Sequence, residues 1–468
     1  MSWLADHWIQ TSLLVAYFAM LIHHALAGRK ESSSVEGYLV AGRNLGGVVI
    51  ALSFYATFMS TNTFIGAAGK SWQYGLSWCV GGVVLSGLAL LSWTVVAPRF
   101  VPLTKQYEAL TFADFLGTHS QSNAVRRLAG VIVAFSSILY LIAIYRGASL
   151  AIELFLGLPY LWCVLLAAVV VTSYTLVGGF KSVVLTDAVQ GFLMLIGAVA
   201  LFCALLFASG GIDSMMDRLR ERSSVLASWT NSEGLAAALA YSIAVGMKYL
   251  VEPRQLSRFY GLRDRSALRT AAWIAPLIIF ISYACLLPIG AMARTVIDSD
   301  TMSTDRVVPY LLGPANLLGP FLGTLFLLVL ISAAMSSIDS VLLVAASTMS
   351  RDVLSDRSEN EVKRVRVWIV VISLTAAGAA LLPFAKDIIR MTKFSGSLYA
   401  ACFLPVFVVG LFLQKRSAKA AILTMLLASA SVVATLILRL NKVVAIQEVY
   451  AGIVVGLVVF FSISWWRD

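Results

Sequence analysis

Apolar segments about 20 residues long follow one another along almost the whole chain, with short polar connections between them. A helix needs about 20 mostly apolar residues to cross the hydrocarbon core of a bilayer, where its backbone groups must bond within the helix. The pattern predicts an all-α polytopic membrane protein with about 13 transmembrane helices. The predicted spans cover residues 8–27, 46–66, 74–96, 127–156, 158–177, 184–209, 235–253, 271–293, 316–347, 367–383, 394–413, 418–440 and 445–466.

Composition excludes several other classes of protein. Charged residues make up 13% of the 468 positions, against about 25% in a soluble domain, so a water-soluble enzyme and a nucleic-acid-binding protein are excluded. The net charge of +11 is instead typical of a membrane protein whose basic cytoplasmic loops face anionic lipid. The histidines and cysteines show no metal-ligand spacing, which leaves a metalloenzyme without ligands.

The charges around the first span predict the orientation of the chain. No Lys or Arg precedes this span, whereas Arg29 and Lys30 follow it, which is the opposite of a signal peptide. We expect an uncleaved first helix in the cell membrane, with the N-terminus outside and the C-terminus inside. Lys and Arg are also more frequent in the loops that this orientation places inside.

The second span carries polar residues at membrane depth. Thr, Ser and Asn occupy five of the seven positions 57–63. Such residues loosen a helix, and non-helical backbone in a membrane is tolerated where it lines a site. Two interpretations remain open: a discontinuous helix whose freed carbonyls bind a cation or solute, and a polar packing seam between helices.

The ninth span contains a similar polar stretch, SAAMSSIDS, at residues 332–340. Positions 333, 336, 337 and 340 share one helix face and offer hard oxygen ligands of the kind an alkali cation needs. Asp339 is a carboxylate well inside an apolar span, which by itself indicates a functional site. The alternative is close packing of small residues, with Asp339 near the membrane interface.

Four stretches together resemble the sodium/solute symporter family. A glycine turn between two spans opens the string GGFKSVVLTDAVQGFLM at 178–194, which places Asp187 and Gln190 on one helix face. This string, GYLVAGR at 37–43, the second span and AAMSS at 333–337 are similar to the family in order and spacing. The segment QLSRFY at 255–260 resembles the family's segment after its broken seventh span. The resemblance covers about residues 8–415.

The resemblance implies a LeuT-type core of two inverted five-helix repeats. We expect a leading helix and loop at 1–45, the first repeat at 46–209, the second repeat at 210–415 and two peripheral helices at 416–468. The seventh span, with Gly246 and Pro253, would then be the partner of the broken second span. The resemblance also implies Na⁺-coupled symport of a small organic solute by alternating access, with Na⁺ as coupling ion and no other cofactor.

The resemblance further implies two groups of cation ligands. The principal sodium site would use carbonyls of Ala56, Met59 and Ala333 and hydroxyls of Ser336 and Ser337. A second sodium site, present in some members, would use Asp187 and Ser340 with Ser336. Asp339 is also a candidate for this possible second site. The family often has a hydroxyl at this position, so one or two Na⁺ per cycle both remain open.

The solute pocket is expected between the breaks in the second and seventh spans. The candidate residues are Asn62, Thr63, Gln73, Arg146, Lys248, Glu252, Arg254 and Phe394. Burial of Arg146 and Lys248 inside spans is costly without an anion, which favours a carboxylate-bearing solute such as a monocarboxylate, an amino acid or a pantothenate-like compound. Structural pairing with Glu153 or Glu252, or snorkelling to the interface, is the alternative.

Other functions remain as rival hypotheses. A sodium/sugar symporter would share the fold and carry a neutral solute. A channel should show a repeated pore-lining motif, a membrane enzyme should show clustered catalytic residues, and neither pattern occurs in the sequence. A transporter-derived sensor would carry a further signalling domain, whereas the chain stops two residues after its last predicted span. We therefore expect a transporter rather than an enzyme, functional as a monomer in the lipid bilayer.

Overall fold

The computed structural model describes residues 8–298, 302–312, 317, 319–355, 360–386, 388–413 and 416–465. These residues are almost entirely helical and contain no strand, which confirms the predicted all-α class. The α-helices are α2 (Trp8–Arg29), α3 (Val35–Val40), α4 (Gly47–Phe58), α5 (Ser71–Tyr74), α6 (Val80–Leu91), α7 (Ala97–Gln106), α8 (Phe112–His119), α9 (Asn123–Leu156), α10 (Tyr160–Ala208), α11 (Ile212–Arg222), α12 (Ser232–Tyr249), α13 (Pro253–Tyr260), α14 (Arg265–Leu286), α15 (Ile289–Ala293), α16 (Val307–Leu312), α17 (Gly319–Thr348), α18 (Glu361–Ala380), α19 (Ile388–Phe403), α20 (Gly410–Leu413), α21 (Ala418–Leu440) and α22 (Glu448–Trp465).

Short 3₁₀ or π segments join several of these helices. They are η1 (Glu31–Ser33), η2 (Ala41–Arg43), η3 (Thr63–Ala67), η4 (Gly75–Cys79), η5 (Ser92–Val96), η6 (Thr304–Arg306), η7 (Met349–Val353), η8 (Pro383–Lys386) and η9 (Leu404–Val409).

The helices have the length and apolarity of membrane spans. Among the described residues, eight helical segments pass this test, and a ninth passes if the bent pair α12 and α13 is one span. Each predicted span overlaps a helix, but α10 runs through two of them and α4 and α22 are shorter. The predicted number of thirteen therefore stays a prediction. Large apolar side chains on the outer surface, such as Trp273 and Val169, suit contact with lipid.

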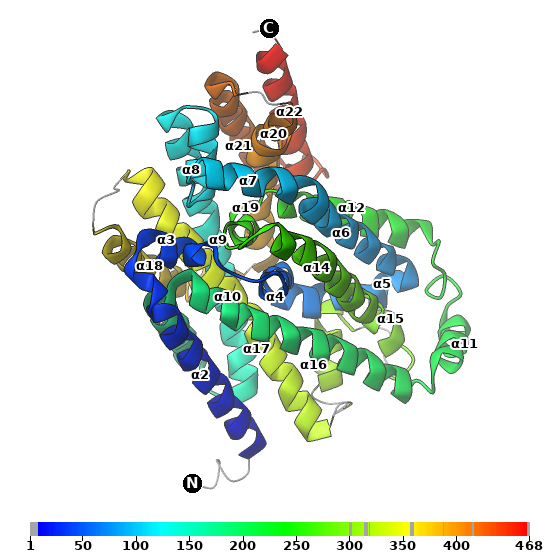
Figure 1. Cartoon of the computed structure of the whole chain (residues 1–468). Coiled ribbons are helices and arrows are strands. Elements are labelled where there is room, and N and C mark those ends of the chain that lie inside the picture. The colour runs from blue at the N-terminus through cyan, green and yellow to red at the C-terminus, as the bar shows by residue number, and fades with distance from the viewer. Residues whose placement is uncertain are drawn as a thin grey trace.

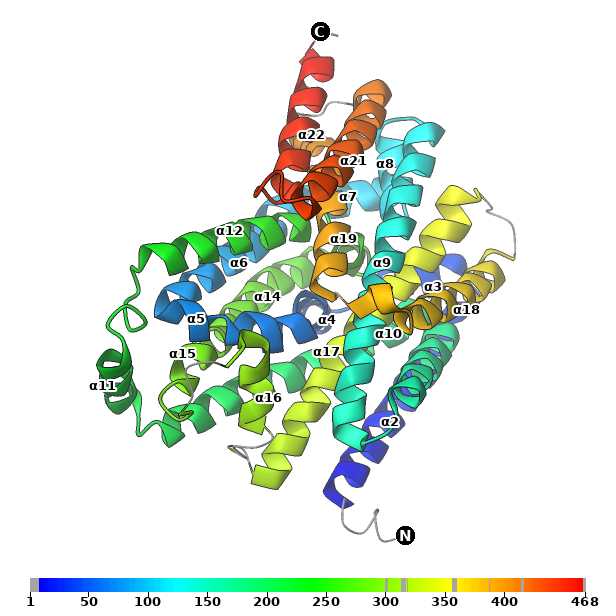
Figure 2. The ribbon, with the colours of Figure 1, turned by 180° about the vertical axis from the view of Figure 1, so that it is seen from behind.

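The long helices α2, α9, α10 and α17 pack around the short central helix α4 or against one another. α10 packs against α2, α4 and α17, and α17 also packs along α9. Figures 1 and 2 show α4 in the middle of the bundle, with α2 and α22 at opposite ends of the molecule. The predicted boundaries at 45/46, 209/210 and 415/416 fall between helices, just before α4, just after α10 and just before α21.

A backbone contact joins the segments that flank two central helices. The Leu45 N–H, just before α4, donates to the Gly261 carbonyl at 2.9 Å, just after α13. The Arg263 N–H donates to the Leu45 carbonyl at 3.1 Å, so Leu45 and Leu262 form an isolated parallel bridge. One end of α4 is thereby tied to one end of α13.

The predicted glycine turn lies inside α10. Gly179 has φ 56° and ψ −151°, a conformation that only glycine adopts readily, and it divides α10 into two helical arms. A Cβ atom on Gly179 would lie 2.7 Å from the Tyr38 carbonyl oxygen. A Cβ atom on the neighbouring Gly178 would lie 3.0 Å from the Ala25 carbonyl oxygen, so α2 packs closely here.

Gly179→Ala is expected to lower the free energy of unfolding by about 1–3 kcal/mol, because alanine is strained at this φ and ψ and would push Tyr38 away. The Tyr38 hydroxyl would then lose its bonds to the Thr175 and Leu176 carbonyls, now 3.2 and 3.3 Å long. Thermal unfolding in detergent measures the effect. Gly87→Ala is the matched control, since open space surrounds Gly87 within α6; equal midpoints for the two variants would contradict the prediction.

Candidate functional site

The second predicted span is broken at its polar stretch. α4 ends at Phe58, and Met59 is extended, with φ −83° and ψ 139°. Helical structure resumes within three residues and continues into η3. Because α4 stops here, the carbonyls of its last turn lose their helical partners and become available to a ligand. The predicted discontinuity of this helix is confirmed, and the binding of a cation or solute by its carbonyls stays a prediction.

The seventh predicted span is broken in a matching way. α12 ends at Tyr249 and α13 begins at Pro253, with a bend of 46° between them. Proline lacks an N–H and disfavours helical backbone before it, and Glu252 is accordingly extended, with φ −70° and ψ 119°. The Tyr249 ring stacks on Phe58 at 4.0 Å, and its hydroxyl donates to the Phe58 carbonyl at 3.4 Å. The two breaks therefore meet.

The residues expected at the principal sodium site lie together. Ser336 Oγ, on α17, donates to the Ala56 carbonyl at 3.2 Å and to the Ala333 carbonyl at 3.3 Å. Ser337 Oγ donates to the Ala333 carbonyl at 3.2 Å. Met59 is the first residue of the break that follows Ala56, and all five residues are buried. Three carbonyls and two hydroxyls form the type of oxygen set that suits a hard cation.

The residues of the possible second sodium site also lie together. Ser340 Oγ is 3.3 Å from Asp187 Oδ2 and 3.0 Å from Asp339 Oδ1, so it lies between the two carboxylates. Tyr174 donates to Asp339 Oδ2 at 2.6 Å, and Ser53 donates to Asp187 Oδ2 at 3.0 Å. All of these side chains are buried.

An arginine that sequence reasoning missed occupies the same cluster. Arg258, on α13, is fully buried and forms an ion pair with Asp187. Its guanidinium also donates to Ser53 at 3.1 Å and to the Arg254 carbonyl at 3.1 Å. The predicted seventh span ends at residue 253, which leaves Arg258 outside the spans, whereas α13 carries it into the core. The available signal was the spacing of Arg254 and Arg258: residues four apart after a proline would lie on one face of a helix that begins there.

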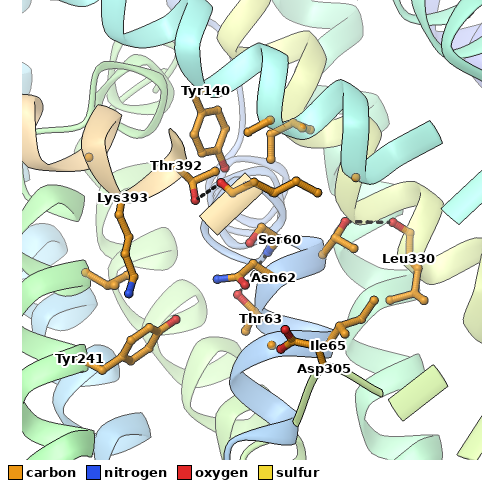
Figure 3. A pocket seen from close by; sticks show the side chains of 18 of the residues that line it. Ser60, Asn62, Thr63, Ile65, Tyr140, Tyr241, Asp305, Leu330, Thr392 and Lys393 are labelled. Carbon is orange, nitrogen blue, oxygen red and sulfur yellow. Dashed lines mark hydrogen bonds between the residues drawn. The ribbon is translucent and has the colours of Figure 1, made fainter. Parts of the chain in front are cut away.

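A cavity of about 810 Å³ lies beside the two breaks and has the size of a small-molecule site. Figure 3 shows Asn62 and Thr63 just after the first break, with Lys393 and Tyr241 on one side and Asp305 on the other. Four of the predicted solute residues line this cavity: Asn62, Thr63, Lys248 and Arg254.

The charges at the cavity are mostly positive. Lys248, Arg254 and Lys393 line it, and Asp305 is the one acid among its described lining residues. Glu252 lies behind the cavity wall, where its Oε1 accepts from Arg254 Nε at 2.7 Å and its Oε2 is 4.0 Å from Lys248 Nζ. The alternative pairing of Lys248 with Glu252 is therefore present.

The other predicted solute residues lie elsewhere. Arg146 donates to the Ala380 carbonyl at 3.3 Å and lies over the Tyr160 ring at 5.4 Å, away from the cavity lining. Gln73 is exposed on α5, and Phe394 is half-buried against the core. The expectation that Arg146 needs a solute carboxylate as its partner is not supported, because a helix-end carbonyl and an aromatic ring already stabilise the guanidinium.

Several lining residues were absent from the sequence prediction. Lys393 precedes the predicted Phe394 by one residue, and Asp305 lies in η6, within a loop that gave no sequence signal. Tyr140 on α9 and Tyr241 on α12 carry apolar rings and hydroxyls into the cavity wall.

Comparison of sequences gives matches along most of the chain. The model of the sodium:solute symporter family matches residues 38–428. The sodium/pantothenate symporter of Haemophilus influenzae is 28% identical over 93% of this chain and 91% of its own. The high-affinity proline transporter of Bacillus subtilis is 25% identical over 90% of this chain and 89% of its own.

Comparison of structures gives the same type of match. A Na⁺-coupled sialic acid symporter, solved in a substrate-bound outward-open state, superposes with a TM-score of 0.82 at 17% identity, covering 98% of each chain. Mhp1, a transporter of the nucleobase-cation-symport-1 family, superposes with a TM-score of 0.57 at 13% identity over 92% of this chain and 94% of its own. These likenesses support the LeuT-type fold that the sequence predicts.

Proposed function

The chain belongs to the sodium:solute symporter family, and from that premise we propose that the solute it carries with Na⁺ is a small organic anion bound through its carboxylate. Membership makes the protein a multi-pass membrane transporter rather than an enzyme, with Na⁺ as the coupling ion. The observation that carries the proposal is the excess of positive side chains at the cavity, which lies beside the two helix breaks.

The distribution of charge favours a net anion over a zwitterion or a neutral sugar. Lys248 and Arg254 share the single carboxylate of Glu252, so one positive charge of this trio is uncompensated within it. Lys248 and Arg254 also lie near the Tyr140 ring, at 5.7 and 4.5 Å, which leaves them in a site of low polarity. A solute carboxylate would supply the missing charge, because a desolvated cation is costly without a partner.

Pantothenate is the first solute to test. It is a carboxylate without a compensating ammonium group, unlike proline, and the pantothenate symporter of Haemophilus influenzae is among the relatives of this chain. The amide and hydroxyl groups of such a solute would find partners in Asn62 and Thr63, at the first break.

Coupling follows from the position of the sodium ligands at the broken helix. Na⁺ held by Ala56, Met59, Ala333, Ser336 and Ser337 would join α4 to α17 and order the break, which completes the solute cavity. The membrane potential contributes about 2.3 kcal/mol per 100 mV for each net positive charge moved inward, so it drives the cycle when two Na⁺ accompany a monoanionic solute and not when one does. The two inverted repeats, at 46–209 and 210–415, would move relative to each other around the site. The protein would function as a monomer, with its N-terminus outside the cell.

Na⁺-dependent uptake of labelled pantothenate into membrane vesicles is the expected result, and Lys248→Gln should raise the half-saturating pantothenate concentration about tenfold or more. The reason is that Lys248 lines the cavity and would lie near the carboxylate. Arg146→Gln is the matched control, expected to keep the wild-type value because Arg146 lies away from the lining. Na⁺-dependent uptake of a neutral sugar without carboxylate uptake would overturn the proposal.

A further inference from the structure

One side chain contacts both the solute cavity and a sodium ligand. Arg254 lines the 810 Å³ cavity, and its Nη1 is 3.3 Å from Ser337 Oγ. The side chain is 3% exposed and is held by Glu252 at 2.7 Å through Nε. Its position follows from the second break, because Pro253 starts α13 and sets Arg254 at the first turn, opposite α17.

The contact with Ser337 places a permanent positive charge beside the principal sodium site. An arginine side chain stays protonated in proteins, so this charge is present at every physiological pH. Ser337 Oγ donates its proton to the Ala333 carbonyl and accepts from Arg254, which occupies one of its lone pairs. A Na⁺ ion at Ser337 would meet a second cation across one oxygen atom, in a buried region where charge repulsion is weakly screened.

We propose that Arg254 is the coupling residue of the transport cycle, acting as a tethered cation whose charge opposes Na⁺ at Ser337 until a solute carboxylate neutralises it. In the absence of solute, the guanidinium donates to Ser337 and weakens Na⁺ binding. A carboxylate in the cavity draws the donors of the guanidinium toward itself and offsets the positive charge. Na⁺ then binds more tightly, and by linkage the carboxylate binds more tightly when Na⁺ is present.

Glu252 sets the strength of this effect. Its carboxylate lies between Lys248 and Arg254, and its Oε2 accepts no hydrogen bond from the described residues. Glu252 therefore compensates part of the charge of Arg254 in the solute-free state. The repulsion between Arg254 and Na⁺ is reduced, so Na⁺ can still bind. The inference rests on the proposed function, since it assumes the cavity as the carboxylate site.

The test is radiolabelled Na⁺ binding to the purified full chain, with and without saturating pantothenate. For the wild type we expect pantothenate to raise Na⁺ affinity about 5- to 150-fold, the usual range of coupling between sites. Arg254→Gln keeps hydrogen-bond donors and removes the charge, so Na⁺ should bind more tightly without solute, and pantothenate should no longer raise its affinity. Arg254→Lys keeps the charge and should retain part of the coupling.

Two control variants separate this role from others. Arg254→Gln alone leaves the negative charge of Glu252 without its partner, and that charge could itself attract Na⁺. The double variant Glu252→Gln and Arg254→Gln removes both charges. Tighter solute-free Na⁺ binding in the double variant would show that the increase in affinity comes from the loss of the arginine charge. Lys393→Gln removes a positive charge from the same cavity on α19, and it should weaken pantothenate binding while Na⁺ binding without solute stays at the wild-type level.

The outcomes distinguish the inference from the proposed function. If the wild type fails to bind pantothenate with Na⁺, the proposed function fails, and the solute-free Na⁺ binding of Arg254→Gln still decides whether the arginine opposes Na⁺. If the wild type shows the coupling and Arg254→Gln keeps both its solute-free Na⁺ affinity and the coupling factor, the role assigned to Arg254 is overturned.

Discussion

Asp187→Asn is expected to abolish Na⁺-coupled uptake and to lower the free energy of unfolding by about 3–5 kcal/mol. The reason is that the variant leaves the Arg258 guanidinium buried without its carboxylate. Ser53 and Ser340 would also lose a charged acceptor, now 3.0 and 3.3 Å away. Membrane insertion should be intact, since the mean hydropathy of the span hardly changes. Uptake in vesicles and thermal unfolding in detergent measure the two effects.

Two further variants test this explanation. Asp187→Asn combined with Arg258→Gln removes both buried charges, so stability should return while coupled uptake stays low. Asp264→Asn is the control on the surface, because Asp264 is an N-cap whose pKa is lowered by the Ala267 N–H, and asparagine caps a helix equally well. Wild-type uptake together with wild-type unfolding for Asp187→Asn would refute the prediction.

Ser336→Ala is expected to raise the Na⁺ concentration for half-maximal uptake by about tenfold or more, because a hydroxyl ligand to a charged group contributes about 1.5–3 kcal/mol. The half-saturating solute concentration at saturating Na⁺ should change much less. Ser337→Ala should act in the same direction on Na⁺, with an added change from the lost Arg254 contact. Uptake measured over a series of Na⁺ concentrations provides both values.

Ser347→Ala is the matched control for these variants. It lies on the same helix α17, and among the described residues its hydroxyl bonds only to the Val344 carbonyl, at 3.0 Å. Its Na⁺ dependence should equal that of the wild type. The sodium assignment on α17 would be wrong if Ser336→Ala and Ser337→Ala also showed the wild-type Na⁺ dependence.

Local sequence features indicated the first helix break as one of two interpretations, and the family resemblance implied the second. The run of hydroxyls and amides at 57–63 and the proline at 253 act on the backbone where they occur, so their effect is visible without tertiary structure, whereas Gly246 lies within α12 and does not interrupt it. The grouping of Ala333, Ser336 and Ser337 follows from helical periodicity alone. The partner across the site, Ala56, came from the family resemblance and not from spacing.

The failures come from contacts between residues distant in the chain. Arg146 finds its partner in the carbonyl of Ala380, which is 234 positions away, and no local pattern encodes that distance. Arg258 lies beyond the predicted end of the seventh span at residue 253, whereas α13 carries it back into the core to reach Asp187. Lys393 lies one residue before the predicted span 394–413, although α19 begins at Ile388 and Lys393 lines the cavity.

The bridge between Leu45 and Leu262 has a mechanical consequence. It joins the ends of the two broken helices through peptide groups alone, so no side-chain substitution deletes it, apart from a proline that removes the N–H of Leu45 or Arg263. α4 and α13 are therefore linked without a dedicated pair of side chains. Because backbone hydrogen bonds form whatever the side chains are, this link between α4 and α13 tolerates substitution at the positions it connects.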